Sequence, residues 1–367
     1  MHRRISLWFS FMIGMLLVSS GCSSPPRERI RIRYEPAAFR RALLERVPQM
    51  PESLLQAPFE VPEAAVELAR RRVDAQPRGP RRIEVLVDLL SAAPPEGLGL
   101  GYDWRVSASA ARTFELGRGN CVSLASVLVG LGRELGWPVY YAEARPRQLT
   151  THDLEDVKIV LDHMVVVVLS KTVQRVIDFT GRVDGDYQIR IIDDLTAYAH
   201  LINNIASQRL VESDSNADPG VWRAALEGFR MATAIQPDLA RAWNNQGVAL
   251  TRLGHFEEAR VAYLRALELD SVFGSVERNL AIMETRSLGT PRVIEAPEPA
   301  APAPHWGRPG RARVLPALIP SSPRRPVPPF PPRGRIPYPP PAPGPEPDPA
   351  LGSGAAPDGL EERSTTP

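Results

Sequence analysis

The residue most able to carry out chemistry in this chain is Cys121, one of two cysteines among 367 residues. It follows the turn sequence Gly119-Asn120 and opens an apolar run at residues 122–131. Asn120 is a favourable helix N-cap, so we expect Cys121 in the first helical turn. Unpaired backbone amides and the helix dipole lower the pKa of a thiol placed there. The pattern predicts a reactive thiolate; the alternative is a cysteine buried as a small hydrophobic residue.

A histidine and an aspartate downstream match the base and the orienting group that a thiolate nucleophile needs. Residues 163–169 begin with His163, are rich in β-branched side chains and predict a strand covered on both faces. Residues 175–179 predict a second strand. A hairpin centred between residues 170 and 171 sets His163 directly opposite Asp178, with Cβ atoms about 4.5–5.5 Å apart. One bulged residue in either strand would turn Asp178 to the other face.

Other acids and histidines fit such a site less well. His152 is expected in a loop and His200 in a later helix, so neither opens a strand. Asp162 is expected to point away from the face of its neighbour in the strand. Asp184 and Asp186 form either a solvated turn or a cation site, and two carboxylates alone make a poor calcium site. No cysteine pair or histidine cluster suggests zinc, so we predict no metal and no cofactor.

The order and spacing of these residues resemble a known enzyme superfamily. A cysteine at the start of a buried helix, followed by a histidine and an aspartate on successive strands, resembles the transglutaminase-like superfamily, relatives of the papain-like cysteine proteases. The likeness covers residues 112–192 and includes Arg-Thr-Phe-Glu at 112–115 and Val-Ile-Asp-Phe-Thr-Gly at 176–181. It implies an α+β fold in which a helix packs on an antiparallel sheet. It also implies that Cys121 is the nucleophile, His163 the general base and Asp178 the orienting carboxylate.

The chemistry implied by this resemblance is attack of the thiolate on an amide, with a thioester intermediate. Water as the acceptor makes the enzyme a protease or amidase, and a lysine amine makes it a cross-linking acyltransferase. The backbone amide of Cys121 is expected among the oxyanion donors. Tyr102 and Trp104 are candidates for an aromatic donor, with packing in the core or an interface as the alternative.

The N-terminus resembles the signal sequence of a bacterial lipoprotein. Arg3 and Arg4 precede an apolar run at residues 5–18, and small residues lead to Cys22. In this interpretation residues 1–21 are removed, Cys22 carries lipid and residues 22–35 form a tether, so the protein is anchored to a membrane of the cell envelope, more in keeping with the outer membrane facing the periplasm. Ser19 departs from the usual pattern, and a plain cleaved signal peptide is the alternative. With Cys22 acylated, Cys121 has no disulfide partner.

A repeat follows the region of the three candidate residues. Ala225, Phe229 and Ala232 recur as Ala259, Tyr263 and Ala266, each displaced by 34 residues, the period of tetratricopeptide helix pairs. We expect a first copy that starts near residues 200–204 and has a long inter-helix loop at 212–220, a second copy that includes residues 242–270, and a capping helix at 275–286. Such arrays bind extended peptides, and Asn244 and Asn245 are candidate peptide-binding residues. The alternative is that both asparagines serve helix packing.

Composition delimits the remaining segments. Helices are expected at residues 62–70 and 82–90, where they wrap the core. Residues beyond 289 hold 24 of the 39 prolines and are predicted to form a disordered tail with polyproline II character. Lys plus Arg total 44 against 42 Asp plus Glu, a net charge of +2 that gives no signature of nucleic-acid binding.

The expected organisation is therefore a signal at 1–21, a tether at 22–35, a transglutaminase-like domain with N-terminal helices at 36–198, tetratricopeptide repeats with a capping helix at 199–288 and a tail at 289–367. The predicted function is that of a membrane-anchored thiol enzyme acting on amide bonds of a protein or peptide substrate, with the repeats recruiting an envelope protein. The alternative is an inactive lipoprotein scaffold that binds envelope proteins. The intact Cys, His and Asp favour the enzyme.

Overall fold

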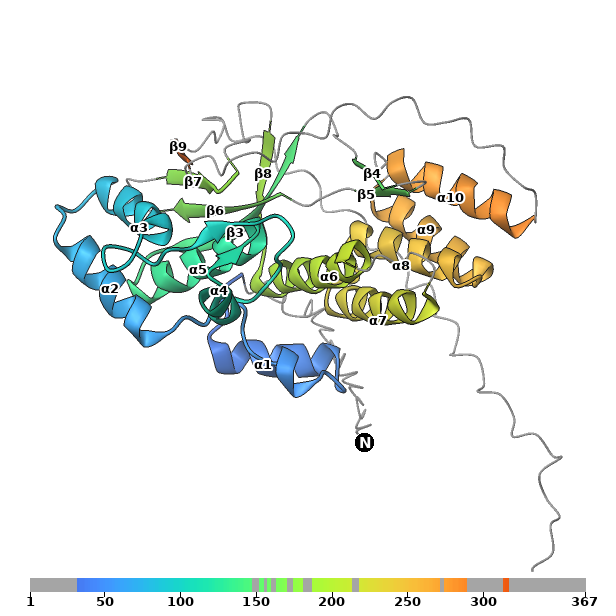
Figure 1. Ribbon diagram of the computed structural model, residues 1–367, viewed down its shortest axis with the longest axis horizontal. Helices are drawn as coiled ribbons and strands as arrows, with labels where there is room; N and C mark the ends of the chain where they lie inside the picture. The colour runs from blue at the N-terminus through green and yellow to red at the C-terminus, as the bar shows by residue number, and fades with distance from the viewer. Residues whose placement is uncertain are drawn as a thin grey trace, which may run out of the picture. The chain divides into compact units, whose positions relative to one another are not determined.

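The computed structural model describes residues 32–146, 152–154, 157–159, 163–169, 174–180, 187–212, 218–270, 274–288 and 313–316. Its helices are α1 (Pro36–Arg46), α2 (Glu63–Asp74), α3 (Arg81–Ser91), α4 (Ala110–Leu116), α5 (Cys121–Glu134), α6 (Asp194–Glu212), α7 (Pro219–Ile235), α8 (Ala240–Arg252), α9 (Phe256–Leu269) and α10 (Gly274–Ser287), with a 3-10 turn at Glu52–Leu54 (Figure 1). Its strands are β1 (Gly101–Tyr102), β2 (Arg118–Gly119), β3 (Val139–Pro146), β4 (His152–Leu154), β5 (Val157–Ile159), β6 (Met164–Leu169), β7 (Gln174–Asp178), β8 (Tyr187–Ile191) and β9 (Arg313–Pro316).

The main sheet has five antiparallel strands in the order β8-β3-β6-β7-β9. Helix α5 packs against β3 and β6, so the predicted mixed fold with a helix on an antiparallel sheet is confirmed. The valine-rich strand β6 is covered on both faces, as its composition predicts. Met164, Val166 and Val168 belong to the core that includes α5, whereas Val165 and Val167 belong to a smaller apolar cluster with β3 and β7.

The register of the β6–β7 pair differs from the predicted one by two residues. Val166 pairs with Ile177 and Val167 with Val176, so the ladder continued toward the start of β6 aligns His163 with Thr180 rather than with Asp178. The expectation that His163 lies directly opposite Asp178 was therefore wrong. Because side chains alternate along a strand with a period of two, a shift by two residues keeps Asp178 on the face that was predicted.

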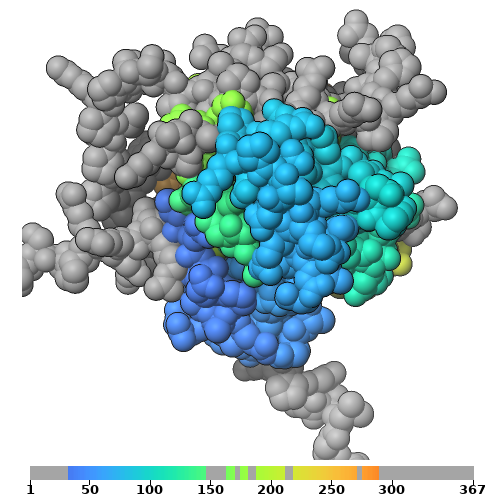
Figure 2. Space-filling view, turned by 90° about the vertical axis from the view of Figure 1, so that its left-hand side faces the viewer, coloured from blue at the N-terminus to red at the C-terminus, as the bar shows by residue number. Residues whose placement is uncertain are grey.

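Helix α5 is buried along its first twelve residues because its sequence is apolar on nearly every side. The N-terminal helices cover this core, and Figure 2 shows α2 and α3 spread over the face of the molecule that is viewed there. Phe39 of α1 makes edge-to-face contacts with Phe59 and with Tyr198 of α6. The predicted helices at 62–70 and 82–90 correspond to α2 and α3.

The C-terminal part is a series of helices that follows the predicted repeats. Helices α6 and α7 form one pair, α8 and α9 form the next, and α10 follows as the single cap. Helix α6 runs across the expected domain boundary between residues 198 and 199. No glycine or proline interrupts it, and its first half packs in the core of the sheet domain while Ala206 packs in the core of the helical array. The two parts are therefore joined by a shared helix and not by a linker.

Three short strands, β4, β5 and β9, lie where the sequence predicted no regular structure. His152 begins β4, which pairs with β5, and is not in a loop. In the proline-rich tail, β9 pairs with β7. Asp162, Asp184, Asp186, Cys22 and the signal and tether up to residue 31 lie outside the described residues. Among the helices of the described part, none is long and apolar enough to cross a membrane.

Candidate active site

Cys121 is the first residue of α5, at the helix end where its sequence placed it. Asn120 caps the helix, because its Oδ1 atom accepts a hydrogen bond from the backbone amide of Ser123 at 3.2 Å. The cysteine is a free thiol and only 6% exposed. Its position in the first turn places it at the helix end that carries unpaired backbone amides and the positive end of the helix dipole.

Neighbouring backbone holds the cysteine turn in place. The amide of Asn120 donates to the carbonyl of Val106 at 2.7 Å, and the amide of Asp103 donates to the carbonyl of Gly119 at 3.0 Å. Gly119 is required here, since a Cβ atom at this position would lie 2.4 Å from the Cβ atom of Ser123. Strand β1 pairs with β2 so that Tyr102 lies beside Gly119. The segment that contains Tyr102 thus runs alongside the turn that precedes Cys121.

Ser123, which no sequence pattern marked as a site residue, links the turn to the preceding loop. Its hydroxyl donates to the carbonyl of Val106 at 3.1 Å and accepts from the amide of Ala108 at 2.8 Å. The side chain of Asn120 also donates to Ser107 Oγ at 2.7 Å. The position of Ser123 three residues after the N-cap indicates its contact with Asn120, whereas its contacts with residues 106 and 108 have no local signal in the sequence.

His163 and Asp178 meet at the ends of their strands. The Nε2 atom of His163 lies 2.9 Å from Oδ1 of Asp178, and the aspartate is fully buried. The backbone carbonyl of His163 accepts from the amide of Ala144 at 2.9 Å, which anchors the histidine to β3. The structure therefore brings the two residues together despite the altered register.

Thr180 completes the surroundings of the aspartate and was not selected from the sequence. Its backbone amide and its hydroxyl donate to Asp178 Oδ1 at 2.9 and 2.8 Å, and the hydroxyl oxygen lies 3.3 Å from His163 Nε2. An aspartate whose carboxylate accepts from the residue two positions later is a common local arrangement. The Asp-Phe-Thr sequence was the signal that could have indicated it.

The protonation of His163 reflects these contacts. Burial acts to lower the pKa of His163, but hydrogen bonds with Asp178 and with Cys121, together with the negative charges of both groups, raise it to about 9. The imidazole is therefore protonated near neutral pH and carries a proton that it can donate. A cysteine, a histidine and an aspartate linked in this order can perform nucleophilic and acid–base chemistry.

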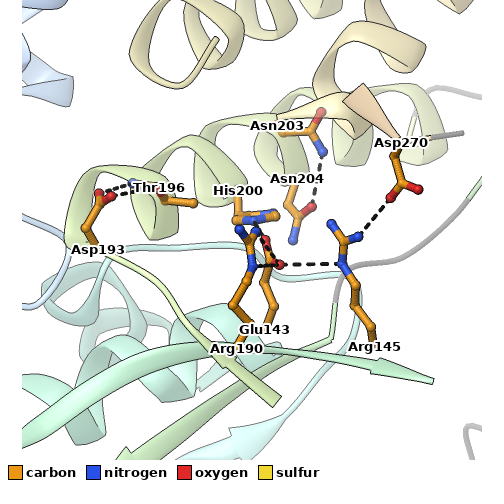
Figure 3. Close-up of polar contacts among 9 residues, drawn as sticks. All are labelled: Glu143, Arg145, Arg190, Asp193, Thr196, His200, Asn203, Asn204 and Asp270. Atoms are coloured by element: carbon orange, nitrogen blue, oxygen red, sulfur yellow. Dashed lines mark hydrogen bonds and ion pairs between the residues drawn. The ribbon is translucent and has the colours of Figure 1, made fainter. Parts of the chain in front are cut away.

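His200, set aside from the sequence as a helical residue, contributes to a different buried cluster. Its Nε2 atom lies 2.7 Å from Oε1 of Glu143 on β3, and Arg190 on β8 donates to Oε2 of the same carboxylate at 2.7 Å (Figure 3). Arg145 lies 3.5 Å from that oxygen and also pairs with Asp270 at the end of α9, at 2.8 Å. The cluster joins the sheet to α6 and to the helical array.

The two asparagines predicted to bind peptide make hydrogen bonds between helices. Asn245 donates to Oδ1 of Asn203 at 3.0 Å, and Asn244 is buried and accepts from Asn279 at 3.0 Å. These bonds connect α8 with α6 on one side and with α10 on the other. In the structure both asparagines therefore serve helix packing. Peptide binding by either residue stays a prediction.

Within the described ranges, no group of three or more His, Cys, Asp or Glu side chains is placed to hold a metal ion.

Comparison with known proteins identifies one part of the chain. The family model described as Tetratricopeptide repeat matches residues 240–271, which comprise α8, the following turn and α9. The predicted repeat is therefore confirmed for this segment. No curated protein matches the chain.

Proposed function

We propose that this protein is a thiol-dependent enzyme of the transglutaminase-like kind that acts on amide bonds of a protein or peptide. The observation that carries the proposal is the placement of His163, which makes hydrogen bonds both with Cys121 and with Asp178. Cys121 is the nucleophile, His163 the acid and base, and Asp178 the group that orients and charges the imidazole. The antiparallel sheet packed on α5 agrees with the fold that this superfamily implies.

The reaction begins with attack of the Cys121 thiolate on the carbonyl carbon of a substrate amide. A carbon–sulfur bond forms and the carbonyl oxygen becomes an oxyanion, to which the Cys121 backbone amide at the start of α5 donates. The carbon–nitrogen bond then breaks as His163 gives its proton to the leaving amine, which yields a thioester. Water or a second amine, deprotonated by His163, attacks the thioester and releases the thiolate. Tyr102 pairs with Gly119, two residues before Cys121. This pairing supports the segment that contains Tyr102 as the source of a second hydrogen-bond donor to the oxyanion.

The repeats and the N-terminus give this enzyme its proposed setting. Tetratricopeptide repeats commonly bind protein segments, and the match at residues 240–271 supports a protein or peptide partner. Cys22 at the end of the signal-like segment is the proposed lipid attachment site, so the enzyme is placed at a bacterial envelope membrane, facing the periplasm. The partner is then an envelope protein, recruited by the array and processed at Cys121.

One observation favours a second candidate function, that of a scaffold that binds proteins without catalysis. Cys121 is only 6% exposed, and a buried thiol is less accessible to substrate than a nucleophile needs to be. In this alternative the network around Cys121 stabilises the fold, and the repeats perform the function.

Thiol reactivity separates the two candidates. The full chain carrying Cys22→Ser, so that Cys121 is the only thiol, is treated with iodoacetamide at pH 7 and the rate of alkylation is followed by mass spectrometry. The enzyme predicts alkylation that slows by at least about tenfold in His163→Ala, since the imidazolium no longer stabilises the thiolate. His255→Ala, which removes a half-exposed histidine of the repeats, serves as the matched control and is expected to change nothing. Slow alkylation that is unaffected by His163→Ala supports the scaffold.

A further inference from the structure

The outer edge of β7 lies next to the candidate active site. Strand β6 covers one edge of β7, and β9 covers the other through four paired residues. Without β9, the amides and carbonyls of β7 that point away from β6 would form an open edge that can pair with any extended chain. Asp178 is the last residue of β7 and pairs with Arg313, the first residue of β9.

The segment that covers this edge combines two aliphatic residues with a terminal proline. Arg313-Val314-Leu315-Pro316 places a β-branched and an aliphatic residue together in a tail dominated by proline. Pro316 ends the strand, which fits a proline's lack of an amide hydrogen and its confinement to strand edges and ends. Aliphatic pairs also occur in the tail at Val293-Ile294 and at Leu318-Ile319, which is followed by Pro320. In the structure, residues 313–316 are the segment that pairs with β7.

We propose that the edge of β7 is a binding site for an extended peptide, with specificity for an aliphatic pair followed by proline, and that residues 313–316 of the same chain are its resident ligand. Addition of a strand to an open sheet edge is an established mode of peptide recognition, in which backbone hydrogen bonds supply most of the affinity. Residues 289–312 connect α10 to β9. A connection of this length holds the ligand at an effective concentration on the order of 1 mM, so the internal segment excludes free peptide of the same sequence.

The proposal does not depend on catalysis by Cys121. It assigns a second peptide site to the sheet domain, separate from the repeats, and places its ligand across the end of the strand that carries Asp178. A protein that presents a similar segment at high local concentration would exchange with the internal strand.

The test uses the full chain and a fluorescein-labelled peptide that spans residues 309–317, which contains the aliphatic pair of β9 and excludes the one at Leu318-Ile319. In Val314→Pro/Leu315→Pro the internal strand cannot pair, because neighbouring amides in a strand point to opposite sides and the two substitutions remove both. We expect this variant to bind the peptide, measured by fluorescence anisotropy, at least about tenfold more tightly than the unmodified chain does. Ser321→Pro/Ser322→Pro adds the same two prolines outside β9 and is expected to behave like the unmodified chain.

A second variant guards against an effect of proline on folding. Replacement of residues 313–319 by alternating Gly and Ser removes both nearby aliphatic pairs and is expected to open the site to the peptide. Hydrogen exchange of the β7 amides provides an independent measurement: those that face β9 become exchangeable in both variants, and those bonded to β6 stay protected. Equal peptide binding by the variants and the unmodified chain, no binding by any of them, or unchanged exchange in β7 would each overturn the proposal.

Discussion

Asp178 and His163 contact each other at 2.9 Å although their strands are shifted by two residues from the register in which they would face directly. A diagonal pair on the same face of an antiparallel sheet is within reach of a long side chain, and imidazole is long enough to close the gap. Thr180 occupies the position aligned with His163 and donates two hydrogen bonds to the aspartate. The shifted register therefore brings Thr180 next to Asp178 and leaves the contact between His163 and Asp178 intact.

The hydroxyl of Thr180 is expected to orient Asp178. Thr180→Val removes one hydrogen bond to a buried carboxylate, which is a loss of about 1.5–3 kcal/mol. We expect alkylation of Cys121 in the Cys22→Ser chain to slow by about tenfold, since a mispositioned aspartate holds His163 less well. Thr180→Ser keeps the hydroxyl and should restore the rate. Equal alkylation rates for the valine and serine variants would show that the backbone amide of residue 180 is sufficient to orient Asp178.

The pH dependence of His163 is a second measurable property. The contacts that raise its pKa to about 9 exist only in the folded chain, while an unfolded histidine titrates near about 6.5. A raised pKa stabilises the folded state fully below about pH 6.5, and this stabilisation is lost as the pH rises through about 9. The free energy of unfolding, measured by urea titration, should therefore fall across this window more steeply than in His163→Gln.

The imidazole itself can be followed by NMR. In the full chain the ring resonances of His163 should titrate near pH 9, and in Asp178→Asn the midpoint should move down because the negative charge and its hydrogen bond are lost. A midpoint near 6.5 in the unmodified chain would contradict the assigned contacts.

Glu143 is expected to stabilise the junction between the sheet and α6. It is 4% exposed, and although burial acts to raise its pKa, the hydrogen bond and charge of His200 and then of Arg190 hold the pKa well below its usual range. Glu143→Gln removes the buried charge that contacts buried His200 and exposed Arg190, and should lower the free energy of unfolding by about 3 kcal/mol near pH 7. Arg145→Met removes a half-exposed partner of the same carboxylate and should cost less than about 1 kcal/mol.

The contribution of Glu143 also has a defined pH window. A lowered pKa stabilises the folded state above the unfolded value of about 4.3, and this stabilisation is lost as the pH falls. The difference between the unmodified chain and Glu143→Gln should therefore shrink below about pH 4. A difference that persists unchanged in acid would point to packing and not to charge.

Close packing in the repeat depends on Gly247. A Cβ atom there would lie 2.7 Å from the ring of Tyr263, so Gly247→Ala forces α8 and α9 apart or displaces the ring. Overpacking of this kind costs about 1–3 kcal/mol. A double-mutant cycle with Tyr263→Leu measures the clash directly: the effect of Gly247→Ala on thermal unfolding should be smaller by about 1 kcal/mol or more in the leucine background.

Local patterns in the sequence were sufficient for several elements. The N-cap at Asn120 and the apolar residues after it predicted α5 and the place of Cys121 in it. The 34-residue period predicted the helix pair at residues 240–271, because small residues recur wherever helices must approach closely. These features depend on neighbours within one or two turns of chain, and such neighbours are visible in the sequence.

The site depends on relations that no local pattern contains. Whether His163 faces Asp178 or Thr180 follows from the length and path of the connection between β6 and β7, and both registers bury the same valines. The cluster of Glu143, His200 and Arg190 joins three elements that are distant in the chain, and the charges become partners only when the elements pack together. Helix α6 likewise crosses the predicted domain boundary, since a helix has no local signal for where one core ends and another begins.

The sequence by itself determined which residue types are present for chemistry, where the cysteine helix begins, the repeat in the second half of the chain and the proline-rich composition of its end. Tertiary structure alone decided the strand register, the contacts of Thr180 and His200, the continuity of α6 and the pairing of β9 with β7. The physical reason is that helix caps and repeat periods are set by short-range sterics and hydrogen bonding. Strand pairing and buried charge pairs are set by which distant segments share a core.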